Sequence, residues 1–209
     1  MTSAENEATL ERLKQACIDD RIWGAVMEEH RSRLRAMIDV RIPNLVRARF
    51  DASDVIQEAM IDASQRLPEY IANPTVPFYV WLRALTGQRL AAAFRRHLGV
   101  RSRNAAREVR LIPNSFPSAT SAAIAAKLVG KLTSPSSVAV MQERRMRLQK
   151  ALEQLEEIDR EILVLRHFEE LSNSESAAVL GLQPTAANNR YIRALGRLKS
   201  ALGAMDEEF

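Results

Sequence analysis

The chain has 209 residues, which is enough for one large helical domain or two small ones. Hydrophobic residues make up 46% of the sequence and aromatic residues only 5%, a balance that favours helices over strands. The formal net charge is +4, and the single cysteine, Cys17, excludes an internal disulfide and fits a reducing compartment. The three histidines show no metal-ligand spacing, so we expect no metal or other cofactor. The polar N-terminus and the lack of a long apolar run predict a cytoplasmic protein without a signal peptide or membrane span.

Helical spacing of apolar residues predicts the first elements. A short amphipathic helix is expected up to about Asp20, and a longer one from Trp23 to about Ile42, where Pro43 interrupts it. A third helix is expected over residues 51–70, with Asp51 as its N-cap.

That third helix carries an acidic stripe. Its acids recur at intervals of three and four, with Gln57 beside them: Asp51, Asp54, Glu58 and Asp62. Acids in the first turn suit the helix dipole, but acids that continue for three turns need another reason. The stripe is either a solvated face or a docking surface for a basic partner.

A basic segment follows a loop at Asn73 to Pro77. From Arg83 to Arg110 there are eight arginines and one acid, which indicates a surface for nucleic acid. Among the interleaved aromatic residues, we expect core packing for Phe78, Trp81 and Phe94. For Tyr79, packing and stacking on an unpaired base are equally open.

Composition shifts between residues 111 and 142, where proline and serine indicate a flexible linker between domains 1–110 and 143–209. One island within it, Ala122 to Leu132, has the spacing of a short helix. In the second domain, Leu148, Leu152 and Leu155 predict one helix, and Asp159 is the expected N-cap of the next.

The strongest local pattern runs from Leu171 to Leu202. Ser172 and Glu175 have the spacing of a capping box. Gly181 suits a left-handed helix end, and Pro184 suits the first turn of a new helix. Apolar spacing then continues through Ala187, Tyr191, Ala194, Leu195, Leu198 and Leu202. A short helix, a tight turn and a longer helix predict a helix-turn-helix.

No acid falls between Pro184 and Leu202, and polar residues lie opposite the apolar stripe of the second helix: Asn188, Asn189, Arg190, Arg193, Arg197 and Lys199. Asparagine can bond adenine and arginine can bond guanine, each with two hydrogen bonds, and the more C-terminal cations suit phosphates. An ordinary solvated helix face is the alternative interpretation.

The order of these motifs resembles the sigma-70 family, in particular the small extracytoplasmic-function (ECF) sigma factors. The resemblance covers Trp23 to Leu202. It rests on the string Asp51, Asp54, Gln57 and Glu58, on Trp81, Leu82 and Arg83 followed by Arg95 and Arg96, and on Ala177 and Gly181 of the helix-turn-helix. It implies an all-α protein with two small helical domains, sigma region 2 and sigma region 4, joined by the linker. The implied function is binding of core RNA polymerase and promoter-specific initiation, without enzymatic chemistry.

The resemblance also implies which residues act. Docking on the clamp helices of the largest polymerase subunit falls to Asp51, Asp54, Gln57 and Glu58. Recognition and opening of the minus-ten element fall to Asn73, Tyr79, Arg83, Gln88, Arg89, Arg95 and Arg96. Recognition of the minus-thirty-five element falls to Gln183, Thr185, Asn188, Asn189, Arg190, Arg193 and Arg197. An anti-sigma protein is a further implied partner.

Departures from the family pattern leave the promoter sequence open. Gln88 stands where many members have Asn, and Asn188 stands where Lys is common. A stand-alone dimeric helix-turn-helix regulator is the alternative function, although it does not account for the acidic stripe or the arginine-rich middle. We do not expect an enzyme, because one helix face spreads the acids Asp51 to Asp62 too far for a single metal ion.

Overall fold

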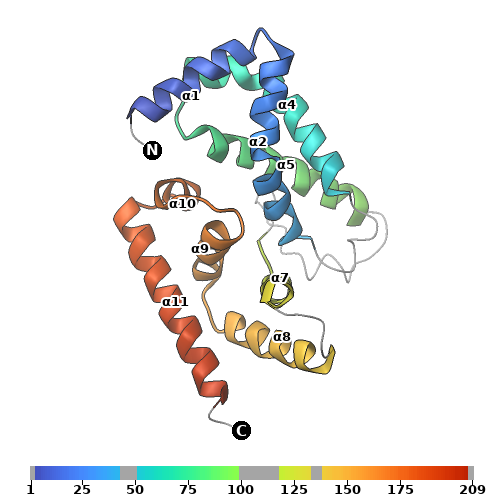
Figure 1. The fold of residues 1–209 in the computed structure, drawn as a ribbon, viewed down its shortest axis with the longest axis vertical. Helices are drawn as coiled ribbons and strands as arrows, with labels where there is room; N and C mark the ends of the chain where they lie inside the picture. Colours follow the sequence, from blue (N-terminus) through green and yellow to red (C-terminus); the bar gives the residue numbers. More distant parts are fainter. Residues whose placement is uncertain (1–2, 43–50, 99–117, 133–137, 207–209) are drawn as a thin grey trace. The chain divides into compact units, whose positions relative to one another are not determined.

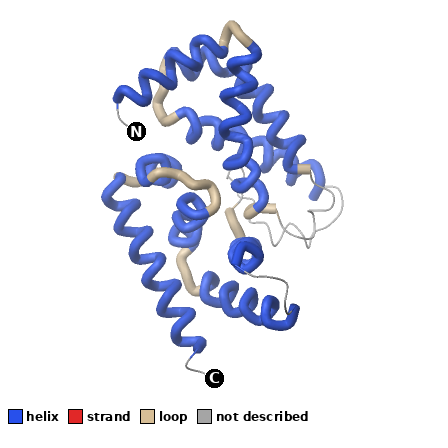
Figure 2. The backbone as a smooth tube through the Cα atoms, viewed as in Figure 1, coloured by secondary structure: helices blue, strands red, loops and turns tan. Residues whose placement is uncertain are grey.

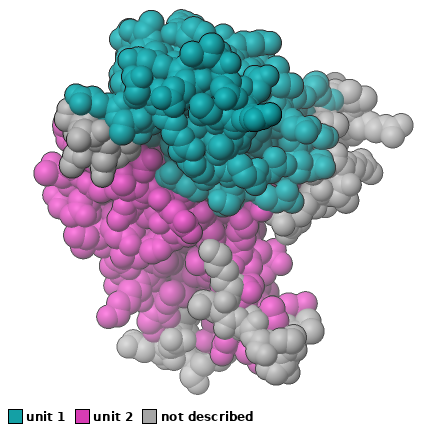
Figure 3. All heavy atoms as spheres, turned by 45° about the horizontal axis from the view of Figure 1, so that its top comes forward, with its two compact units in different colours: residues 1–38, 50–117 teal, residues 39–49, 118–209 magenta. Residues whose placement is uncertain are grey.

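The computed structural model describes residues 3–42, 51–98, 118–132 and 138–206, and within these ranges every regular element is a helix (Figures 1 and 2). The predicted all-α class is therefore confirmed. The chain divides into two compact units, residues 1–38 with 50–117 and residues 39–49 with 118–209 (Figure 3).

The first unit contains α1 (Ser3–Ala16), most of α2 (Asp20–Asp39), α4 (Ala52–Ala72) and α5 (Phe78–Leu98). Helix α4 packs against α5 and also contacts α1. The core is made of side chains that recur at three- and four-residue spacing on each helix, among them Leu34, Ile38, Ile56, Ala59, Ala63, Leu67, Leu82, Leu90 and Phe94.

Both ends of α4 are capped by nearby groups. The carboxylate of Asp51, the predicted N-cap, accepts a 2.8 Å hydrogen bond from the Ser53 backbone N–H, and this bond lowers the pKa of Asp51. At the other end, the Asn73 backbone N–H donates to the carbonyls of Glu69 and Tyr70, each at 3.2 Å. The helix ends at Ala72, two residues beyond the predicted end.

The loop between α4 and α5 is held by an aromatic residue. The Tyr70 hydroxyl donates a 2.8 Å hydrogen bond to the Val76 carbonyl, and its ring stacks on Trp81 with centroids 4.7 Å apart. Burial raises the pKa of Tyr70 to about 12. The hydrogen bond and the ring contact of Tyr70 therefore hold the loop that contains Asn73 against the ends of α4 and α5.

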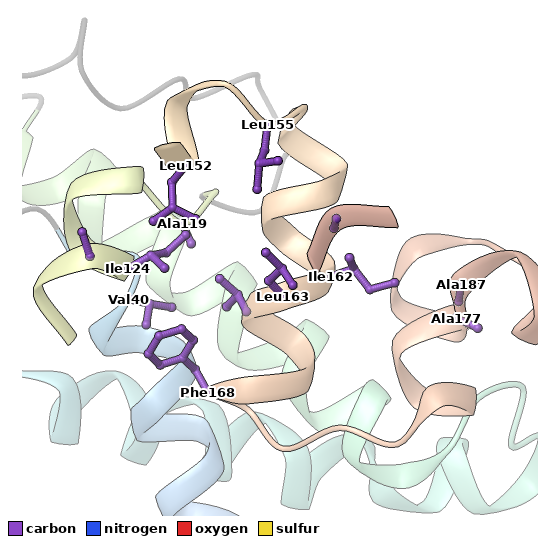
Figure 4. Close-up of a cluster of buried hydrophobic side chains, with 13 residues drawn as sticks. Val40, Ala119, Ile124, Leu152, Leu155, Ile162, Leu163, Phe168, Ala177 and Ala187 are labelled. Atoms are coloured by element: carbon purple, nitrogen blue, oxygen red, sulfur yellow. The ribbon is translucent and has the colours of Figure 1, made fainter. Parts of the chain in front are cut away.

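The second unit contains α7 (Ser121–Leu132), α8 (Val138–Glu153), α9 (Glu157–His167), α10 (Asn173–Leu180) and α11 (Pro184–Asp206). Helix α11 contacts α8, α9 and α10, and α7 packs on α8. Figure 4 shows the shared core, in which Leu152, Leu155, Ile162 and Phe168 are buried.

Part of the segment predicted as a flexible linker is built into this core. Helix α7 coincides with the predicted island, and its Ile124 and Ala125 are 1% and 0% exposed. Helix α8 begins at Val138, inside the range assigned to the linker. The apolar residues of the island outweigh the proline and serine around them, because burying them removes apolar area from water.

A short segment that follows α2 also belongs to the second unit. Val40 joins the core cluster, and the buried Arg41 guanidinium bonds to two carboxylates. Its Nη1 donates to Glu169 at 2.8 Å, and its Nη2 donates to Glu161. A buried arginine requires such partners, because an uncompensated charge in the interior is very costly.

The helix-turn-helix forms as predicted. The Ser172 hydroxyl accepts from the Glu175 backbone N–H at 3.1 Å, and the Glu175 carboxylate accepts from the Ser172 backbone N–H at 2.8 Å. Gly181 ends α10 in the left-handed conformation with φ of 65°, and Pro184 begins α11.

Candidate nucleic-acid and protein interfaces

The acidic stripe of α4 divides into two parts. Asp54 and Gln57 are exposed, and Asp54 makes no ion pair in the part of the chain that the structure describes. Glu58 and Asp62 lie on the side of the stripe next to α5. There Glu58 accepts two 3.0 Å bonds from Arg96, and Asp62 accepts from Arg89. The stripe is thus a partly neutralised surface rather than a uniform row of charges.

An exposed apolar residue lies within this stripe. Ile61 is 59% exposed on α4, one turn beyond Gln57 and two turns beyond Asp54. Our sequence reasoning missed it, although its position between Glu58 and Asp62 was the available signal. An apolar side chain among acids is the composition expected of a protein contact rather than of a purely solvated face.

Some residues that the resemblance assigned to the minus-ten element are at the surface. Asn73, Gln88 and Arg95 are exposed, whereas Arg89 and Arg96 are in the ion pairs with α4. The bond to Asp62 raises the pKa of Arg89, so this side chain is a cation at any pH relevant to the protein.

Tyr79 and Arg83 are buried instead, at 3% and 5% exposure. The Arg33 guanidinium of α2 lies 3.7 Å from the centroid of the Tyr79 ring, and the His30 ring lies 5.5 Å from it. For Tyr79, packing is therefore the interpretation that holds. The reason is that α5 is covered over a wide arc, by α4 and, at Tyr79, by a side chain of α2.

Helix α11, the second helix of the helix-turn-helix, presents part of its predicted polar face to solvent. Its exposed members include the residues of the turn and the first two helical turns, together with one arginine: Gln183, Thr185, Asn188, Asn189 and Arg193. These side chains follow directly after the Gly181 turn, where a helix-turn-helix contacts base edges.

Arg190 and Arg197 turn toward α9, which corrects the expectation of an unbroken basic face. Each donates to the carboxylate of Asp159, Arg190 at 2.6 Å and Arg197 at 2.8 Å. Asp159 is 2% exposed, and the bond raises the pKa of Arg190. Asp159 also differs from its predicted role, because Glu156 is the N-cap of α9 and Asp159 lies within the first turn.

Two apolar residues of α11 are exposed on the side away from these arginines. Ile192 is 57% exposed and Leu195 is 38% exposed, although Leu195 was predicted to lie in the apolar stripe. The buried positions of α11 are the small residues Ala187, Ala194 and Ala201, which allow close approach to the neighbouring helices. Their narrow stripe leaves Leu195 at its edge.

In the described ranges, no group of three His, Cys, Asp or Glu side chains is placed to hold a metal ion. No helix there has the length and apolar character needed to cross a membrane.

Comparison with known proteins addresses the helix-turn-helix unit directly. The family profile described as "Sigma-70, region 4" matches residues 145–198, which include α9, α10 and most of α8. The match places this part of the chain in the sigma-70 family, whose members are sigma factors that act in transcription.

Comparison with solved structures extends the likeness beyond residues 145–198. The structure of CnrH in complex with the cytosolic domain of CnrY matches with a TM-score of 0.54 and 23% identity, over 93% of this chain and 97% of that chain. The sigma factor RpoE in complex with the anti-sigma factor NepR from Bartonella quintana matches with a TM-score of 0.42 and 20% identity, over 81% and 89%. The CnrH match shows a shared fold. A search of curated protein sequences gives no match.

Proposed function

We propose that this chain is an ECF-type sigma factor that binds core RNA polymerase and directs it to specific promoters. The observation that carries the proposal is the capped helix-turn-helix inside the region 4 match, with Asn188, Asn189 and Arg193 exposed on its second helix. These side chains supply the donor and acceptor groups that distinguish bases in the major groove. We assign them to the minus-thirty-five element.

The proposed polymerase contact is the exposed part of the α4 stripe. Asp54 and Gln57 offer polar groups, and Ile61 offers an apolar side chain on the same face. A charged rim around an apolar contact suits a basic helical partner, and we assign this surface to the clamp helices of the largest polymerase subunit. Asp51 contributes mainly by capping the helix that presents these groups.

The proposed minus-ten contact lies on the first unit. Asn73 at the end of α4, Gln88 and Arg95 on α5 are exposed, and the loop after Asn73 is anchored by the Tyr70 hydroxyl. Each of the two domains predicted from the sequence, residues 1–110 and residues 143–209, would then carry one of the two DNA contacts. Because both are carried by one polymerase-bound chain, the second contact gains from a high effective concentration.

A protein inhibitor is part of the proposal. CnrH was solved with the cytosolic domain of CnrY, and the RpoE structure holds an anti-sigma factor. We propose that a comparable partner covers the polymerase-binding surface around Asp54. The chain would work in the bacterial cytoplasm as a specificity subunit without covalent chemistry of its own.

The test is co-elution with core RNA polymerase, followed by transcription from a library of genomic promoter fragments. Wild-type protein should bind core and produce defined start sites. Asp54→Lys should weaken core binding, whereas Glu7→Lys makes the same charge change at an exposed position of α1 and should not. A stable homodimer that binds a palindrome and ignores core would establish the helix-turn-helix regulator instead.

A further inference from the structure

We propose that polymerase docking and minus-ten DNA binding are linked through ion pairs between α4 and α5. In the unbound chain, Arg89 and Arg96 of α5 neutralise Asp62 and Glu58 of α4. A basic partner that takes over the acids releases the arginines for DNA phosphates. This inference rests on the proposed function and names a regulation of the same two surfaces.

The pairs form a ladder across the two helices. Arg89 Nε donates to Asp62 Oδ2 and its Nη2 to Oδ1, so the contact is a two-bond fork. One turn along α4, Arg96 Nη2 donates to both carboxylate oxygens of Glu58 at 3.0 Å. Each rung therefore joins a residue assigned to, or next to, the polymerase surface with a residue assigned to DNA.

The fork explains why the two functions compete. Arginine binds phosphate through the same parallel N–H groups that bind a carboxylate. While Arg89 holds Asp62, its Nε–H and Nη2–H cannot also be given to a phosphate in that geometry. The acids, in the same way, cannot offer all their oxygens to a basic partner. Arg95, which is exposed and makes no ion pair in the described ranges, lies outside this competition.

The exchange of partners is energetically feasible. The side chains of Arg96 and Glu58 are 59% and 36% exposed, and those of Arg89 and Asp62 are 37% and 13% exposed. Solvent-exposed pairs such as Arg96–Glu58 are weak, and Arg89 is accessible enough from solvent for an incoming charged partner to compete for it. By thermodynamic reciprocity, any factor by which polymerase raises DNA affinity is the factor by which DNA raises polymerase affinity.

A purely structural role would be to fasten α4 to α5. The two roles differ in one measurable quantity, the salt dependence of DNA binding. Each additional phosphate that a protein neutralises on single-stranded DNA steepens the slope of log K against log salt by about 0.7. Releasing both arginines should therefore steepen the slope by up to about 1.4, whereas the loss of a purely structural contact between α4 and α5 should leave the slope unchanged.

The experiment uses the full chain and a fluorescently labelled single-stranded DNA of random sequence. The test variant is Glu58→Gln/Asp62→Asn. The matched control is Glu69→Gln/Glu7→Gln, which removes two charges from exposed positions of the first unit that make no ion pair among the described residues. The test variant should show the steeper slope and a several-fold higher affinity at low salt than the control. Equal slopes in the two variants would overturn the linkage.

A second variant guards against misfolding. Glu58→Gln alone breaks only the more exposed rung and should give about half of the slope change, with an unchanged far-ultraviolet circular dichroism spectrum. A slope equal to that of wild type would reject the proposal. The outcome is separate from the proposed function, because DNA binding is measured without polymerase. If wild-type protein fails to bind core, the sigma proposal fails while the slopes still test the ion pairs.

Discussion

Substitution of Asp159 by alanine tests how much of the recognition helix is held by α9. The carboxylate is buried and accepts one bond from Arg190 and one from Arg197, and it has no other side-chain partner among the described residues. The variant should loosen the attachment of α11 to α9 without changing the exposed residues that we propose to contact DNA.

The magnitude follows from the exposure of the two arginines. The Arg190 side chain is 26% exposed, so its charge-assisted bond is expected to contribute about 1.5–3 kcal/mol. The Arg197 side chain is 51% exposed, and solvent reduces its contribution to about 0–1 kcal/mol. Glu156, which lies 3.4 Å from Arg190 Nη1, recovers a little of the loss. We therefore expect Asp159→Ala to destabilise the second unit by about 2–3 kcal/mol.

Urea unfolding of the full chain can assign this loss to the correct unit. Both tryptophans, Trp23 and Trp81, lie in the first unit, so their fluorescence follows that unit alone. Far-ultraviolet circular dichroism follows the helices of both units. The part of the dichroism change that tryptophan fluorescence does not follow belongs to the second unit. Asp159→Ala should lower the urea midpoint of that part. Arg193→Ala, at an exposed position of the same helix, is the control and should change stability by less than about 0.5 kcal/mol.

The DNA-binding behaviour of the same variants completes the test. Arg193→Ala should weaken promoter binding by about 1–3 kcal/mol if it contacts a base, whereas Arg190→Ala should act mainly through stability. The reasoning would be refuted if Asp159→Ala and Arg190→Ala left the second unit as stable as wild type. It would also fail if Arg190→Ala removed base-specific affinity at full stability, because Arg190 would then leave Asp159 to bind DNA.

Three further predictions concern single residues. In ultraviolet titration, the Tyr70 hydroxyl should lose its proton only at about pH 12, and Tyr70→Phe should abolish this ionisation step. The stability that the buried neutral hydroxyl provides is complete below its ordinary pKa of 10.0 and is lost as pH rises through 12. Gly181→Ala should lower the free energy of unfolding of the second unit by about 1–2 kcal/mol in urea. The cost comes from the left-handed backbone alone, because among the described residues no atom beyond the adjacent residues lies within 4 Å of the added Cβ. Arg41→Met should lower the free energy of unfolding by about 3–5 kcal/mol in the same assay, and adding Glu169→Gln should restore part of that loss. An unchanged urea midpoint in Arg41→Met would mean that the Arg41–Glu169 ion pair contributes nothing to stability.

Features set by neighbours in the sequence could be predicted. The capping box, the left-handed Gly181 and the first-turn Pro184 each depend on a few adjacent residues, and all three form as expected. The acidic stripe of α4 was predicted on the same grounds, because three- and four-residue spacing fixes which side chains share a face.

Features set by distant partners could not be predicted. Aspartate is a common N-cap residue, so the sequence predicts that role for Asp159. Only the packing of α9 on α11 brings its carboxylate to Arg190. The burial of Tyr79 depends on Arg33 of another helix. Helix α7 has the apolar spacing of a helix, yet its incorporation into a core requires α8 beside it. In each case the sequence identifies the side chain, but the residues that it contacts lie on another helix and depend on the tertiary fold.

The ion pairs between α4 and α5 also limit how such a protein can evolve. Asp62 and Arg89 belong to different proposed surfaces but to one electrostatic contact, and so do Glu58 and Arg96. A substitution of either arginine that alters the proposed phosphate contact leaves an acid of α4 without its partner, and a substitution of either acid does the converse. Related chains that lack an acid at position 62 should therefore also lack an arginine at position 89. If the proposal holds, the strength of DNA binding and the fit to polymerase change together and are not selected one at a time.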